Sequence, residues 1–115
     1  MGTSISIEGF SLTTPSTWVP VFGNYCGPGW SSGKRTDSPD YGEPPIKIDG
    51  RESPVDAICK AHDQAYTAAE GQPNEASQIL EADMQLRREI STLDFNTLNG
   101  TEKTYARLMD FTFAT

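Results

Sequence analysis

Two predicted helices joined by a three-residue break constrain the fold of this chain more than any other feature. The first covers residues 54–70, follows a serine that is a preferred N-cap, and has a proline at its first position. Gly-Gln-Pro at residues 71–73 ends it, and an asparagine then caps a second helix over residues 74–93. Because the connection is so short, the two helices are expected to run antiparallel.

Each predicted helix carries one titratable residue on its apolar side. His62, the only histidine of the chain, and Asp83 lie among the following apolar residues: Val55, Ile58, Cys59, Ala65, Tyr66 and Ala69 on the first helix, and Ile79, Leu80, Met84, Leu86 and Ile90 on the second. An acid buried on such a face is costly unless it has a partner. If the faces meet, Asp83 should accept a hydrogen bond from His62, which leaves the second ring nitrogen as a base that can activate water. The alternative is a histidine that merely satisfies its hydrogen bonds in the core.

A glycine-rich segment precedes the helix pair. Residues 23–30 contain three glycines and a proline, which predict a tight loop with exposed backbone. Such a loop is either an ordinary turn or a set of carbonyl oxygens aimed at a hard cation such as Ca²⁺. Asp63 points about 100° away from His62 on a helix. It could therefore add a carboxylate to an oxygen cage, which suits Ca²⁺ better than Zn²⁺.

The two cysteines lie on either side of this arrangement. Cys26 is in the glycine-rich loop, and Cys59 is one helical turn before His62. Their number permits one disulfide, two free thiols or a shared metal. If they are joined, the bridge would hold the loop onto the helix beside Asp63.

The remaining segments predict short strands, loops and one more helix. An N-terminal arm over residues 1–22 should be extended, with Val19 and Val21 in the core, whereas Trp18 and Trp30 could face either the core or a lipid interface. Residues 31–53 predict a long surface excursion with a short strand near residues 46–48. A last helix is expected over Thr101–Asp110, with Thr101 as its cap and the following residues packed inward: Tyr105, Leu108, Met109 and Phe111.

These elements predict a single domain over residues 1–115 of mainly α class. An antiparallel helix pair (54–93) would carry an active site, joined by the glycine-rich loop (23–33), a long irregular loop and a short C-terminal helix. The net charge of −7 argues against a nucleic-acid binder, which needs basic groups to neutralise phosphates. No apolar run approaches the roughly 20 residues that span a bilayer, and no signal peptide can be recognised.

Two motifs resemble those of the secreted phospholipase A2 family. Residues 25–29 are YCGPG and are similar to the family's calcium loop, Tyr-Cys-Gly-x-Gly. Residues 59–66 are CKAHDQAY and resemble its active-site helix, Cys-x-x-His-Asp-x-Cys-Tyr. A looser third match is EAD at residues 81–83, where the second family helix supplies the aspartate that orients the histidine. The resemblance covers roughly residues 23–90.

The resemblance implies calcium-dependent hydrolysis of the sn-2 ester of glycerophospholipids at a membrane or micelle surface. His62 would be the general base acting through water, and Asp83 would orient it. Calcium, with the Gly27 amide, would stabilise the oxyanion. The implied calcium ligands are the Asp63 carboxylate and the backbone carbonyls of Tyr25, Gly27 and Gly29.

The resemblance also implies a Cys26–Cys59 disulfide and a supporting hydroxyl from Tyr66 behind the aspartate, with Tyr105 as a candidate for a second such tyrosine. It implies a protein that is secreted or delivered outside the cytosol. Ile58 and Ala65 stand where the family has further cysteines, so the many-disulfide scaffold is missing and the chain looks like a minimal microbial or viral-like member.

Two other functions stay open. One is a phospholipase-like binding or toxin module without turnover. The other is a small zinc module that uses Cys26, Cys59 and His62 as ligands, with a carboxylate as the fourth. The oligomeric state does not follow from the sequence.

Overall fold

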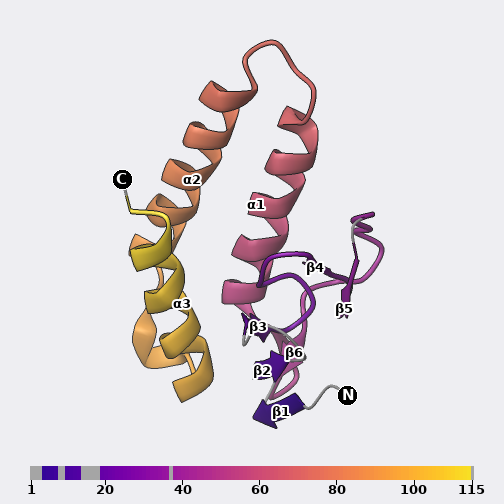
Figure 1. The fold of residues 1–115 in the computed structure, drawn as a ribbon. Helices are drawn as coiled ribbons and strands as arrows, with labels where there is room; N and C mark the ends of the chain where they lie inside the picture. Colours follow the sequence, from indigo (N-terminus) through magenta and orange to yellow (C-terminus); the bar gives the residue numbers. More distant parts are fainter. Residues whose placement is uncertain (1–3, 8–9, 14–18, 37, 115) are drawn as a thin grey trace.

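The structure is a computed structural model that describes residues 4–7, 10–13, 19–36 and 38–114. Within these residues it has three α-helices and one 3₁₀ turn: α1 (Pro54–Ala69), α2 (Glu75–Ser91), η1 (Phe95–Thr97) and α3 (Gly100–Thr112). The described strands form three small antiparallel sheets: β1 (Ser4–Ile7), β2 (Phe10–Thr13) and β3 (Val19–Phe22); β4 (Trp30–Ser31) and β5 (Lys34–Arg35); β6 (Lys47–Ile48) and β7 (Arg51–Glu52). Helices α1 and α2 pack together as the predicted antiparallel pair, with α3 alongside and the strands gathered near the start of α1 (Figure 1).

The start of α1 follows the predicted cap and is also tied to α3. The Ser53 hydroxyl accepts the backbone N–H of Asp56 at 3.2 Å and donates to the buried Glu102 carboxylate at 2.7 Å. Glu102 belongs to a capping box at the start of α3, in which Asn99 is the N-cap. The prediction of Thr101 as this cap was wrong. The cap is Asn99, two residues earlier, which exchanges a reciprocal pair of hydrogen bonds with Glu102.

Helix α2 begins and ends within two residues of its predicted bounds, but part of its predicted apolar side is exposed. Leu86 and Ile90 are buried, whereas Leu80 and Met84 are 47% and 44% exposed. The reason is that α3 runs beside only the later half of α2 (Figure 1), so the earlier half is covered mainly by α1. Asn74 takes the N-cap position, although its side chain makes no capping hydrogen bond.

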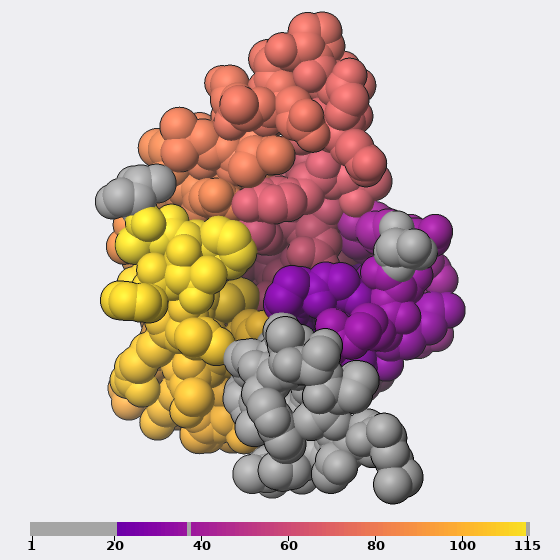
Figure 2. Space-filling view, in the orientation of Figure 1, coloured from indigo at the N-terminus to yellow at the C-terminus, as the bar shows by residue number. Residues whose placement is uncertain are grey.

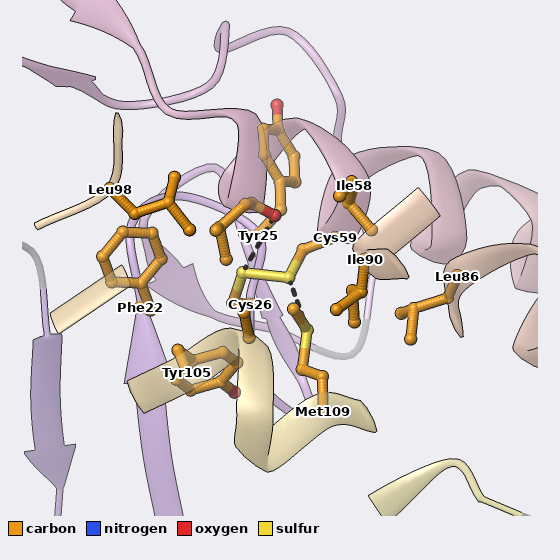
Figure 3. Packing of buried hydrophobic residues seen from close by; sticks show 12 residues of the cluster. Phe22, Tyr25, Cys26, Ile58, Cys59, Leu86, Ile90, Leu98, Tyr105 and Met109 are labelled. Atoms are coloured by element: carbon orange, nitrogen blue, oxygen red, sulfur yellow. Dashed lines mark hydrogen bonds between the residues drawn. A yellow bond between two sulfur atoms is a disulfide. The ribbon is translucent and has the colours of Figure 1, made fainter. Parts of the chain in front are cut away.

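The hydrophobic core lies where the three helices meet the loop after β3. Its buried members are Phe22, Tyr25, Cys26, Val55, Ile58, Cys59, Leu86, Ile90, Leu98, Tyr105, Ala106 and Met109. Figure 3 shows a Cys26–Cys59 disulfide in the middle of this cluster, with Met109 against Cys59. The disulfide implied by the resemblance is therefore present. Phe111 was wrongly expected inside: it is 82% exposed, and Leu108 is 37% exposed.

The two segments before α1 are more structured than predicted. The N-terminal arm supplies β1, β2 and β3, and Val21 is buried as expected, while Trp18 and the Val19 side chain lie outside the described residues. Residues 30–53 carry two short hairpins, β4–β5 and β6–β7, and the strand predicted near residues 46–48 is present as β6. In the part of the chain that the structure describes, no helix is long and apolar enough to cross a membrane.

Candidate functional site

A cavity of about 860 Å³ opens between the glycine loop (residues 23–33), α1 and α3. Figure 2 shows the surface hollowed between these parts, with α1 at the bottom of the hollow. Residues that the sequence singled out line it together, among them Tyr25, Gly27, Gly29, Cys59, His62, Asp63 and Tyr66. Residues from two segments more than 30 positions apart in sequence thus share one cavity.

A hydrogen-bonded chain across α1 and α2 lies beside the cavity, and its members His62 and Tyr66 line the cavity wall. The Nε2 atom of His62 lies 2.8 Å from Oδ1 of Asp83, and the Tyr66 hydroxyl donates to the same oxygen at 2.6 Å. Both aromatic partners come from α1, one turn apart, and Asp83 faces them from α2. Burial first, and then the bond to Asp83, raises the pKa of Tyr66 well above its usual range, so this hydroxyl remains a donor.

This geometry determines what His62 can do. Since a carboxylate accepts the Nε2–H, the neutral ring carries its lone pair on Nδ1. Among the described residues, no hydrogen bond reaches Nδ1. The ring is only 8% exposed and packs against Tyr66 and Phe113, with centroids at 4.5 and 4.6 Å. The imidazole is therefore a held and largely dehydrated base with one available nitrogen.

Asp63 is partly buried, whereas the other acids that line the cavity, Glu70 and Glu75, are exposed. No hydrogen bond or ion pair from the described residues reaches its carboxylate, although its backbone carbonyl accepts the Tyr41 hydroxyl at 2.9 Å. Burial raises the pKa of Asp63 to about 8, and the negative charge of Asp56 contributes to that rise. A cation beside this carboxylate would offset both effects, so Asp63 fits a metal ligand.

The donor set around Asp63 favours a cation that takes oxygen ligands. The described residues hold no group of three or more His, Cys, Asp or Glu side chains placed to bind a metal. A cation would thus depend on backbone carbonyls and water as well as Asp63, as Ca²⁺ sites often do. The zinc alternative needs the thiolates of Cys26 and Cys59, which are joined in the disulfide and unavailable.

The glycine loop is held in place by Asp56, whose role the sequence did not reveal. Its fully buried carboxylate accepts three backbone N–H groups: Tyr25 at 2.9 Å on Oδ1, and Asn24 at 2.9 Å and Ile46 at 2.8 Å on Oδ2. Gly23 approaches so closely that a Cβ atom would lie 2.6 Å from Oδ2 of Asp56, and its φ is +59°. An acid in the first turn of a helix is common because it interacts favourably with the helix dipole, so its position alone did not indicate this role.

Further contacts hold the loop against α1. The Tyr25 hydroxyl donates to the Glu43 carbonyl, which also accepts Lys60 Nζ at 3.2 Å, and the Lys60 ammonium lies 5.3 Å from the Tyr25 ring centroid. The Trp30 indole donates to the Gly23 carbonyl at 2.9 Å. Together with the disulfide, these bonds hold the loop in place.

Two more residues at the site were missed from the sequence. Tyr41 joins the long segment to α1 through its bonds to Asp63 and Thr67, and Phe113 packs on His62 from the end of α3. A tyrosine in a Pro- and Gly-rich segment and a phenylalanine at a helix end carry no pattern that indicates these contacts. Tyr105 is buried and stacks on Phe22, and its assignment as a second supporting tyrosine stays a prediction.

A scan against protein-family models finds no family that matches the chain. Searches of curated proteins and of solved structures likewise return no match. The functional argument therefore rests on the motifs and on the geometry of the cavity.

Proposed function

We propose that this protein is a calcium-dependent phospholipase A2, which hydrolyses the sn-2 ester of glycerophospholipids at a membrane or micelle surface. The observation that carries the proposal is the hydrogen-bonded chain Tyr66–Asp83–His62. Its His62 and Tyr66 line one cavity with Asp63, whose carboxylate no hydrogen bond or ion pair from the described residues reaches. Residues of this kind, a base held by an acid beside a cation ligand, are what ester hydrolysis by water requires. The disulfide is compatible with a site of action outside the cytosol.

In this proposal His62 is the general base. Its Nδ1 takes a proton from a water molecule as the water oxygen forms a bond to the ester carbonyl carbon. The Nε2–H stays bonded to Asp83, which stabilises the imidazolium, while Tyr66 holds the second lone pair of Asp83 Oδ1. The imidazolium then returns the proton to the leaving alkoxide when the ester C–O bond breaks. The products are a fatty acid and a lysophospholipid.

The residues that would hold calcium are the carboxylate of Asp63 and the backbone carbonyls of Tyr25, Gly27 and Gly29. When bound, the ion supplies positive charge that polarises the ester carbonyl and stabilises its developing negative charge. The Gly27 N–H would add a hydrogen bond to the same oxygen. The position of Asp63 supports this assignment. Its carboxylate is partly buried and receives no hydrogen bond or ion pair from the described residues, so a divalent cation would supply the missing partner.

The test is hydrolysis of liposomes that carry a labelled fatty acid at sn-2. We expect release of label with calcium, none with EDTA, and a loss of at least about a thousandfold in His62→Gln. Gln64→Ala, an exposed position on the same helix, is the matched control and should keep full activity. Release that persists in EDTA or in His62→Gln would refute the proposal. Calcium-dependent binding to liposomes without any release would instead indicate the module without turnover.

A further inference from the structure

The end of α3 brings a side chain to the site that neither motif contains. Phe113, the C-cap residue of α3, packs its ring on His62 with the centroids 4.6 Å apart and the planes 60° apart. Tyr66 contacts the same imidazole at 4.5 Å and 47°. The imidazole is thus contacted by one carboxylate and by two aromatic rings, and these three groups come from three different helices.

We propose that Phe113 is a positioning residue, which holds the His62 imidazole so that Nδ1 faces the water to be deprotonated. This inference rests on the phospholipase function proposed above. It gives the last turn of α3 a part in the reaction, although its residues touch neither the implied metal nor the proton.

The need for a second constraint follows from the geometry of a hydrogen bond. The bond to Asp83 holds His62 at Nε2 alone, and the ring can still tilt about that point. A tilt displaces Nδ1, and a misplacement of roughly 1 Å costs up to about a hundredfold in rate. Tilted and edge-on aromatic contacts are the favoured packing of such rings and oppose the tilt.

Phe113 is itself well anchored. Its backbone N–H donates to the carbonyl of Met109 at 3.0 Å, and Met109 is buried against the disulfide. One turn before Phe113, the Asp110 carboxylate accepts a hydrogen bond from Arg87 Nε–H of α2 at 3.0 Å. The last turn of α3 is therefore held by contacts with the core and with α2. These contacts fix the place at which the Phe113 ring packs on His62.

A competing role for Phe113 is that of a plain cavity wall, because it lines the cavity beside Leu108 and Thr112. The two roles predict different kinetics. A wall that contacts substrate changes KM, whereas a group that orients the base changes kcat. Phe111 offers a matched control, since it is the same residue type two positions away and is 82% exposed.

The experiment compares Phe113→Ala, Phe113→Leu and Phe111→Ala in the full chain. The first measurement is the rate at which diethyl pyrocarbonate modifies the single histidine, followed by the absorbance of the modified imidazole. The second is kcat and KM with a short-chain phosphatidylcholine below its micelle concentration. In Phe113→Ala we expect modification at least about threefold faster, kcat lower by about tenfold or more, and KM within about twofold. Phe113→Leu should fall between, and Phe111→Ala should match the parent.

Two results would overturn the inference. One is a Phe113→Ala protein whose KM rises while kcat and the modification rate stay at parental values, which would make Phe113 a wall. The other is equal behaviour of Phe113→Ala and Phe111→Ala. The modification rate can be measured without turnover. A parent protein that hydrolyses no phospholipid would therefore refute the proposed function, and the modification rates would still test the contact of Phe113 with His62. Phe113→Leu keeps the apolar volume and serves where the alanine variant does not fold.

Discussion

Asp56 and Asp63 lie two turns apart on α1. Asp56 is fully buried and Asp63 is partly buried, and the partners of their carboxylates differ. The Asp56 carboxylate accepts the backbone N–H groups of Asn24, Tyr25 and Ile46, whereas no donor in the described part of the chain reaches the Asp63 carboxylate. Burial raises the pKa of both. The comparison separates an acid that organises the loop from an acid that faces the cavity and lacks a partner. The first turn of α1 thus holds the glycine loop in place through Asp56, and its middle turns carry His62 and Asp63 at the cavity.

Removing the disulfide tests how the glycine loop is held against α1, and it should have the largest effect. The Cys26→Ala/Cys59→Ala variant opens a loop with a sequence separation of 33 residues, and the free energy of unfolding should fall by about 3 to 4 kcal/mol. Denaturant titration measures this change. If the fall is below about 1 kcal/mol, the bonds of Asp56 alone suffice to hold the glycine loop.

The Asp63→Asn substitution tests whether Asp63 binds calcium. Asp63→Asn removes the charged ligand and should lower calcium affinity by about a hundredfold or more. Asp83→Asn should change calcium affinity by less than about threefold, because the hydrogen bonds of Asp83 to the described residues go to His62 and Tyr66. Titration calorimetry with calcium gives both values. Equal losses in the two variants would contradict the division of roles.

The Asp56→Asn substitution should instead lower the free energy of unfolding. An amide presents only one acceptor oxygen to the three backbone N–H groups, and its NH₂ would face a donor. We expect the free energy of unfolding to fall by about 2 kcal/mol, with calcium binding weakened only as far as the loop loosens. Denaturation curves should show Glu81→Gln, an exposed change on α2, as unaltered. A stability equal to that of the parent would show that the three hydrogen bonds are dispensable.

The last effect is a pH dependence set by Asp63, which is small over any single pH unit. Its pKa rises from an ordinary 3.8 to about 8 in the folded chain, so between these values the folded state binds more protons than the unfolded state. Without calcium, stability should therefore fall as the pH rises through this window. Calcium must displace that proton, so its affinity should rise about tenfold per pH unit up to about pH 8. Calorimetry across this range should show both trends, and Asp63→Asn should flatten them.

Much of the candidate site could be predicted because its residues are neighbours in sequence. Cys59, His62 and Asp63 lie within five positions of one helix, so helix geometry alone gives their relative directions. Asp83 could be paired with His62 because each is the polar residue on an apolar face and the connection between the helices is short. Tyr66 follows from the same phase, since it lies one turn after His62.

Other residues of the site had no such signal. Phe111 and Phe113 are alike in type and nearly adjacent, but one is exposed and the other covers His62, because the place where α3 ends beside α1 decides which ring turns inward. Leu80 and Met84 fit the apolar pattern of α2 and are exposed where α3 no longer runs beside that helix.

The sequence by itself determined the helix pair, the glycine loop and the short-range motif. Only the tertiary structure decided that Asp56 holds the loop and that Phe113 packs on His62. The physical reason is that periodicity and capping are local, whereas these two residues act on groups 31 to 51 positions away in the chain. Such contacts depend on where whole helices end and meet.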